Sequence, residues 1–109
     1  MNSSRLDQLL AFHEEDPSDS FVRFALASEY NKLGDRVSAR GHFEALRKHD
    51  PNYVGLYYHL GKLLEDMDQL TEALDVYRAG IVVAEGISDF HARSELQSAL
   101  LEAEMAQFE

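Results

Sequence analysis

The sequence predicts an all-α fold built from antiparallel helix pairs, and two observations carry this prediction. The pair Asp16-Pro17 recurs as Asp50-Pro51, 34 residues later. The same interval matches bulky with bulky and small with small residues, and within each copy these residues are spaced as on one face of a helix. A fixed period of this length indicates a repeat architecture. The matched residues are Leu26 and Leu60, Ala27 and Gly61, Tyr30 and Leu64, Ala39 and Ala73, and Phe43 and Tyr77.

Each copy is predicted to be a helix, a turn and a second helix. The short polar breaks Gly34-Asp35 and Met67-Asp68 suit the end of one helix and the capping of the next. Small residues such as Ala27 and Gly61 suit places where two helix backbones approach closely.

The pattern resembles the tetratricopeptide repeat, in the form of a short bacterial-type domain. That repeat has a bulky residue, Leu-Gly, Tyr, a later Ala, a spaced Phe or Tyr and a closing Pro. The resemblance covers about two thirds of the chain. It implies an α-solenoid of about six helices, stacked as pairs in a short right-handed superhelix. The matching residues are Leu26-Ala27, Tyr30, Gly34, Ala39, Phe43 and Pro51 in the first copy, and Tyr57, Leu60-Gly61, Ala73 and Tyr77 in the second.

Residues 1–16 are predicted to form a helix equivalent to the second half of a repeat. Ser3 or Ser4 can cap this helix, and Asp7 is placed to meet its positive end. Asp16-Pro17-Ser18 ends it, because the residue before a proline avoids the helical region.

The two full repeats are predicted over residues 18–51 and 52–85. We expect helices at 18–33 and 35–48 in the first repeat. In the second we expect helices at 52–67 and 68–84, with Gly86 as a plausible helix stop.

Residues 88–109 are predicted to form a capping helix that is out of register with the repeats, and the whole chain, residues 1–109, to form one domain. A shifted apolar stripe runs through Leu96, Ala99, Leu100 and Ala103. Terminal units of solenoids commonly present one polar side to water. The 34-residue interval places polar side chains where apolar ones are expected, at His91, Ser94, Glu95 and Ser98. The polar side is predicted to comprise Glu95, Gln97, Glu102, Glu104 and Gln107.

Composition and charge narrow the function classes. The net charge of -10 disfavours nucleic acid and anionic lipid and mildly favours basic partners, although most acidic side chains are expected simply to solvate helix surfaces. Cysteine is absent, which excludes disulfides and cysteine-bound metals. Apolar runs such as 81–84 are too short for a membrane span, and the N-terminal residues lack the apolar core of a secretory signal, so a cytoplasmic protein is expected.

The sequence offers no catalytic or metal-binding motif, so we expect no enzyme, cofactor or metal. His42 and His49 are two helical turns apart, too far to share one ion. The carboxylate pairs Glu14-Glu15 and Glu65-Asp66 are adjacent in sequence and diverge on a helix. No phosphate-binding loop or nucleophile elbow is found.

The resemblance implies that the first helix of each pair lines a concave groove, which we predict to bind a peptide or a helix of a partner protein. Aromatic residues would form an apolar floor with a polar rim. Ala92 and Leu96 of the capping helix would extend this face. Alternatively, Phe21 and Phe24 pack beneath a terminal helix and leave no groove. The predicted partner-binding residues are Phe21, Phe24 and Tyr58 as anchors, Asn31, Lys62 and Glu65 as orienting groups, and Ser28 beside them.

Well-known members of the family grip a C-terminal carboxylate with Lys, Asn and Arg side chains on the inner helices. Here most matching positions hold Phe24, Ser28, Tyr58 and His59, and Lys62 alone does not replace the cationic set. An apolar or mixed ligand is therefore favoured.

The alternative function is a self-assembling structural protein, a homo-oligomer formed through its terminal helices. Two full repeats are fewer than the three or so that normally suffice for a stable stack. A second copy would complete the stack. The predicted contacts are Leu6, Leu9, Leu10, Phe12, Leu101, Met105 and Phe108.

Overall fold

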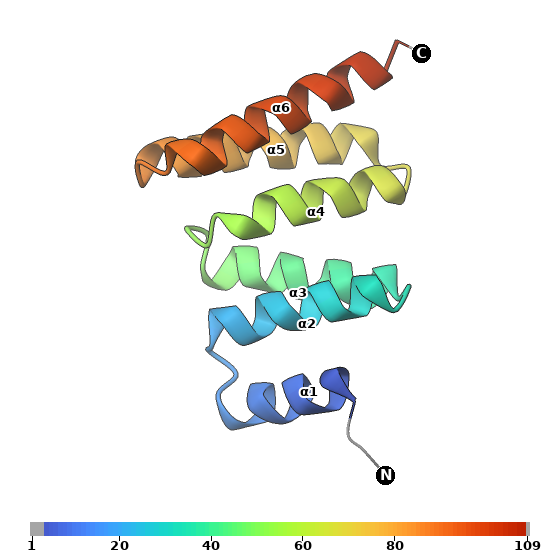
Figure 1. The fold of residues 1–109 in the computed structure, drawn as a ribbon, viewed down its shortest axis with the longest axis vertical. Helices are drawn as coiled ribbons and strands as arrows, with labels where there is room; N and C mark the ends of the chain where they lie inside the picture. The colour runs from blue at the N-terminus through green and yellow to red at the C-terminus, as the bar shows by residue number, and fades with distance from the viewer. Residues whose placement is uncertain (1–3, 109) are drawn as a thin grey trace. The chain divides into compact units, whose positions relative to one another are not determined.

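The computed structural model describes residues 4–108, and this part of the chain consists of α-helices and connecting turns without a strand (Figure 1). Consecutive helices run in opposite directions within each half of the chain (Figure 1). The predicted all-α fold of helix pairs is confirmed. The helices are α1 (Arg5–Glu15), α2 (Ser20–Lys32), α3 (Arg36–His49), α4 (Gly55–Asp66), α5 (Leu70–Gly86) and α6 (Phe90–Ala106).

The helices form two compact units, which we call unit 1 (Met1–Asp50) and unit 2 (Pro51–Glu109). In unit 1, α2 packs against both α1 and α3. In unit 2, α5 packs against both α4 and α6, and α4 also contacts α6. The boundary falls inside the recurring Asp50-Pro51 pair. The single domain over residues 1–109 stays a prediction.

Four of the six helices begin with a side-chain cap. In each, an Oγ or Oδ1 atom accepts a hydrogen bond of 3.0 to 3.2 Å from the backbone N–H three residues ahead. Such a bond satisfies one of the amides that the first helical turn leaves without a partner. Ser4 is the cap of α1, with Asp7 in the first turn as predicted, whereas Ser3 lies outside the described residues. The capping residues are Ser4, Asp19, Asp35 and Asp89.

Helix α4 begins three residues later than the predicted start at Asn52. The segment before it is held against α4 by a hydrogen bond, in which the Tyr57 hydroxyl donates to the Pro51 carbonyl at 2.6 Å. Val54 is the first flanking residue of α4 and makes no side-chain cap.

The turns after α2, α4 and α5 share one geometry. In each, a residue with positive φ is followed by one whose N–H donates to a carbonyl five residues back, at 2.8 to 2.9 Å. This is the Schellman arrangement, which satisfies carbonyls left free at a helix end. The positive-φ residues are Gly34 (φ 87°), Asp68 (φ 59°) and Ser88 (φ 58°).

Two predicted boundaries are corrected by these turns. Asp68 was expected to begin the second helix of its repeat, but it occupies the left-handed corner and α5 begins at Leu70. Gly86 was expected to stop that helix, but it is the last helical residue, and the left-handed corner falls at Ser88.

The core of unit 1 lies between α2 and its two neighbours. Leu9 of α1 packs with Val22 and Leu26 of α2, and Leu6 and Tyr30 cover this cluster. Helix α3 buries the side chains that its repeat pattern predicted to be apolar, namely Ala39, Phe43 and Leu46.

The core of unit 2 depends on two glycines at helix crossings. A Cβ at Gly61 would overlap the ring of Tyr77, and a Cβ at Gly80 would lie 2.5 Å from the Cβ of Tyr57 and 3.0 Å from Leu96 Cδ1. The predicted close approach of helix backbones at small residues is therefore confirmed. On α6 the shifted stripe is largely confirmed, with Leu96, Ala99 and Ala103 buried and Leu100 half-buried.

Unit 1 contains a cluster of imidazole rings against α2. The His42 ring stacks on Tyr30 with centroids 5.4 Å apart, and the His13 ring meets His42 edge-on at 6.1 Å. Arg23 lies 3.4 Å from His13 Nε2. Burial lowers the pKa of His42, and the charges of Arg23 and His13 lower it further.

We expect the free energy of unfolding to fall as the pH drops below about 6.5. In the unfolded chain His42 binds a proton near its ordinary pKa, whereas in the folded chain it binds one only at lower pH, so acid favours unfolding. His42→Phe keeps a ring beside Tyr30 and removes the titrating group. Urea unfolding at about pH 7.5 and about pH 5.5 should show a smaller difference for His42→Phe than for the wild type. An equal difference in both would contradict this account.

Candidate functional site

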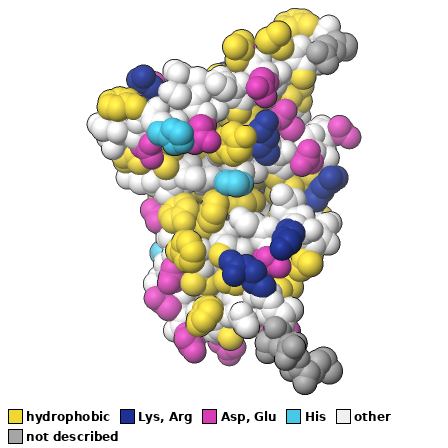
Figure 2. Space-filling model, viewed as in Figure 1, with side chains coloured by type: hydrophobic (Ala, Val, Ile, Leu, Met, Phe, Trp, Pro, Cys, Tyr) yellow, Lys and Arg dark blue, Asp and Glu magenta, His cyan; other side chains and the backbone are white. Residues whose placement is uncertain are grey.

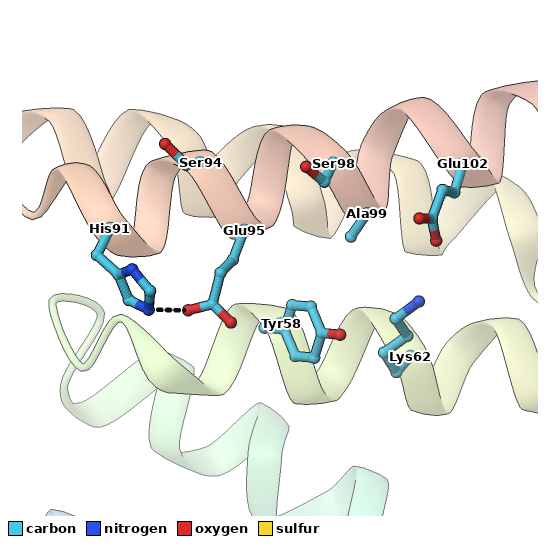
Figure 3. Close-up of a pocket in the computed structure, with 8 residues that line it drawn as sticks. All are labelled: Tyr58, Lys62, His91, Ser94, Glu95, Ser98, Ala99 and Glu102. Atoms are coloured by element: carbon cyan, nitrogen blue, oxygen red, sulfur yellow. Dashed lines mark ion pairs between the residues drawn. The ribbon is translucent and has the colours of Figure 1, made fainter.

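A groove runs between α4 and α6 in unit 2 and has a volume of about 310 Å³. One wall comes from α4 and the other from α6 (Figure 3). It therefore lies within a single unit, where α4 and α6 are in direct contact. Its lining residues are Tyr58, Lys62, His91, Ser94, Glu95, Ser98, Ala99 and Glu102.

The α4 wall presents an aromatic ring and an ammonium group. Lys62 Nζ lies 5.6 Å from the centroid of the Tyr58 ring, within the range of a cation–π contact. The same ammonium lies 4.0 Å from the Glu65 carboxylate on the next turn. The charge of Lys62 is thus partly compensated from within α4.

The α6 wall is polar and acidic. His91 Nε2 lies 3.1 Å from Glu95 Oε1, and Figure 3 shows His91, Glu95 and Glu102 extending from α6 toward α4. Glu95 and Glu102 were predicted to belong to the water-facing side of a capping helix. Both are exposed, as expected, and both also line the groove, together with Ser94 and Ser98.

A smaller hollow of about 110 Å³ lies beside the groove and shares Tyr58 and Glu95 with it. Ala92 and Leu96, predicted to extend the binding face, both line this hollow. Leu96 is only 1% exposed, so it forms part of the base. The remaining lining residues are Val54, Gly55 and His59.

The predicted site residues of unit 1 have different surroundings. Phe21 is 65% exposed and Asn31 is exposed, whereas Ser28 is half-buried. Phe24 is also half-buried, and its ring packs edge-on against Phe43 with centroids 6.0 Å apart. Phe24 therefore contributes to packing inside unit 1, while Phe21 presents its ring to the surface.

Glu65, a predicted orienting group, is engaged inside unit 2. The hydroxyl of the buried Tyr77 donates a hydrogen bond to its carboxylate. Burial and this hydrogen bond raise the pKa of Tyr77, so the hydroxyl keeps its proton and remains a donor. Glu65 thus links α4 to α5 and lies beside Lys62.

The predicted oligomer contacts divide by exposure. Leu9 is 6% exposed and Leu6 is partly buried, and both pack in the core of unit 1. The others are exposed: Leu10 (37%), Phe12 (54%), Leu101 (58%), Met105 (61%) and Phe108 (88%).

The two units differ strongly in charge. Residues 51–109 carry eleven Asp and Glu against three Lys and Arg, a net -8, whereas residues 1–50 carry nine against seven, a net -2. Figure 2 shows acidic side chains (magenta) interspersed with hydrophobic ones (yellow) over unit 2. The half of the chain that contains the groove is therefore the strongly acidic half.

Residues 4–108 contain no group of three or more His, Asp and Glu side chains arranged to hold a metal ion. No helix within this range is long and apolar enough to cross a membrane.

The chain is 48% identical to a tetratricopeptide repeat domain protein from Salinibacter ruber, and both a crystal structure and a solution structure of that protein are similar to it. The crystal structure matches with a TM-score of 0.76 over 79% of this chain and 97% of that one. The solution structure matches with a TM-score of 0.79 over 82% and 90%. The chain therefore belongs to the tetratricopeptide repeat family. No protein-family model and no curated protein matches it.

More distant structures share the fold alone. A protein from Bordetella parapertussis is 23% identical, with a TM-score of 0.83 over 96% of this chain and 91% of that one. The type III secretion translocator chaperone SycD from Yersinia enterocolitica is 15% identical, with a TM-score of 0.86 over 95% and 72%.

Proposed function

We propose that this chain is an interaction module that binds a peptide or a helix of a partner protein in a groove on its helical repeats. The observation that carries the proposal is the groove between α4 and α6, which is lined by a half-buried aromatic ring and polar side chains. Protein-binding sites are commonly built in this way. The structural similarity to a translocator chaperone, whose name describes action on other proteins, supports it.

The predicted residues take different parts in this proposal. Tyr58 serves as the anchor, since its ring lines both hollows of unit 2. Lys62 orients the ligand from beside it. Phe21 and Asn31, with Ser28, remain proposed contacts on α2. Phe24 and Glu65 act indirectly, because their packing and hydrogen bonding hold the helices that present the others.

We expect Tyr58→Ala to weaken peptide binding by about tenfold or more, as truncation of an aromatic anchor typically does. The ligands are peptides selected from a displayed random library against the full chain, with affinity measured for each purified peptide. Val82→Ala, at a 70% exposed residue of α5 outside the groove, is the control and should leave affinity unchanged. If the selected peptides bind Tyr58→Ala as well as the wild type while circular dichroism shows equal helicity, the groove is not the binding site.

Self-assembly is a second candidate, favoured by exposed apolar residues at the C-terminal end of α6. Leu101 and Met105 are four apart on α6, which places them on one helix face, and the exposed Phe108 follows the end of the helix. On this proposal a second copy covers that face, and the molar mass measured by light scattering rises with concentration. Replacing Leu101 and Met105 by Ser should abolish the rise. A constant monomer mass at every concentration would remove this candidate.

A further inference from the structure

We propose that the groove between α4 and α6 selects a peptide segment in the polyproline II conformation with two cationic residues three positions apart, one facing Glu95 and the other facing Glu102. This inference rests on the proposed function and specifies the chemistry of its partner. It follows from the spacing of the two carboxylates, the position of Tyr58 between them and the charge of unit 2.

The two carboxylates are spaced for an extended ligand. Glu95 and Glu102 line the same groove from one helix, and the Glu95 side chain is 53% exposed. Seven residues of α-helix rise by about 10.5 Å. Three residues of a polyproline II chain span about 9.3 Å, and its three residues per turn bring every third side chain back to the same face. Alternate turns of α6 therefore match every third side chain of a peptide lying parallel to it.

Tyr58 suits the middle of such a segment. In Figure 3 its ring lies between Glu95 and Glu102 along the groove. A phenol face accepts an aliphatic side chain or the stem of an Arg, and it attracts cations. An apolar residue between the two cationic ones would contact this ring.

The groove favours cations although Lys62 lies on its α4 wall. The ammonium of Lys62 lies 4.0 Å from the Glu65 carboxylate, whereas the carboxylates of Glu95 and Glu102 line the groove and Glu95 has the imidazole of His91 beside it at 3.1 Å. The groove therefore keeps two carboxylates for a ligand. The net charge of -8 on residues 51–109 further attracts a basic peptide and speeds its encounter.

The test is an NMR titration of the ¹⁵N-labelled full chain with four capped hexapeptides at low salt. The first is Ala-Arg-Ala-Leu-Arg-Ala. The second places the two Arg next to each other in a peptide of the same composition. The third and fourth replace both Arg of the first by Gln or by Glu. We expect the first peptide to shift the backbone amides of Tyr58, Glu95 and Glu102 and to bind about tenfold tighter than the Gln peptide. The adjacent-Arg peptide should bind about threefold more weakly than the first.

Two variants locate the effect. Glu95→Gln with Glu102→Gln should remove the preference for Arg over Gln. Asp75→Asn with Glu85→Gln removes the same charge from α5, outside the groove, and should keep the preference. Glu95→Lys with Glu102→Lys should reverse it, so that the Glu peptide binds tighter than the Arg peptide.

Several results would overturn the inference. If the Gln or Glu peptide shifts the groove amides as strongly as the Arg peptide, the groove holds peptides without selecting cations, and only the proposed function stands. If both Arg peptides bind with equal affinity, and the double variant Glu95→Gln with Glu102→Gln binds them as tightly as the wild type does, then the peptides are attracted only by the net charge of unit 2 and the inference is wrong. If no peptide shifts the groove amides, the inference fails, and the library selection decides the proposed function independently.

Discussion

Gly80→Ala is expected to destabilise unit 2 by about 2–3 kcal/mol, as overpacking of a close-packed core does. The new methyl group would lie 2.5 Å from the Cβ of Tyr57 and 3.0 Å from Leu96 Cδ1. The Tyr57 Cβ is attached directly to the backbone of α4, so it cannot rotate away. The Tyr57 hydroxyl is also held by the Pro51 carbonyl. Helix α5 must therefore move away from α4 and α6.

Gly86→Ala is the matched control, because Gly86 lies on the same helix and a Cβ there meets no atom within 4 Å. Its expected effect is small, at most about 1 kcal/mol in the stabilising direction, since alanine favours the helix over glycine. Urea unfolding followed by circular dichroism measures both variants. A Gly80→Ala variant as stable as the wild type would show that the three helices do not meet tightly at this residue.

Gly80→Ala is also expected to weaken peptide binding in the groove. Leu96 packs beside Gly80 of α5, and the next two turns of α6 carry Ala99 and Glu102, which line the groove. A shift of α6 therefore displaces one wall. The titration with the Arg peptide can detect this effect in the absence of urea, at a temperature at which the variant is still folded.

Phe43→Ala is expected to cost about 3–5 kcal/mol, the usual range for removing a buried phenylalanine. Phe43 is 1% exposed, and its ring meets Phe24 edge-on at 6.0 Å. Its removal leaves a cavity between α2 and α3 and uncovers Phe24. A unit of about fifty residues has little stability in reserve. Unit 1 is therefore expected to lose most of its protection.

Hydrogen exchange of the backbone amides measures this loss residue by residue. The amides of α2 and α3 should exchange much faster in Phe43→Ala than in the wild type. Val37→Ala, at a 76% exposed residue of the same helix, is the control and should leave exchange unchanged. Equal exchange in Phe43→Ala and the wild type would contradict a core centred on Phe43.

Most of the fold was predictable because the 34-residue interval records how side chains pack. Gly61 marks a crossing where a larger side chain has no room, because the ring of Tyr77 fills the space beside it, and the matching Ala27 and Phe43 are both buried. Such constraints remain visible in a single sequence. The helix starts were less predictable. Asn52 resembles a capping residue, yet the hydrogen bond between Tyr57 and Pro51 holds the preceding segment outside the helix.

The candidate site was only partly predictable. Tyr58 and Lys62 were identified from the face of α4 that points away from its core, and both line the groove. The α6 residues were missed, because the strict interval placed Glu95 at a core position. An offset of 39 residues matches Leu96 with Tyr57 and Ala103 with Leu64. That offset, five residues longer than the 34-residue interval between the earlier copies, was the available signal that α6 follows the pattern of α4.

The three Schellman turns have a consequence for recognising similar hairpins in other sequences. They share the same backbone geometry, but only the corner after α2 uses glycine, while Asp68 and Ser88 occupy the other two. A scan that required glycine at this position would find one corner in three here. The feature that all three turns share is a hydrogen bond from the N–H after the positive-φ residue to a carbonyl at the end of the preceding helix. Hairpin boundaries in divergent solenoids are therefore better sought through polar residues just before a new helix than through glycine alone.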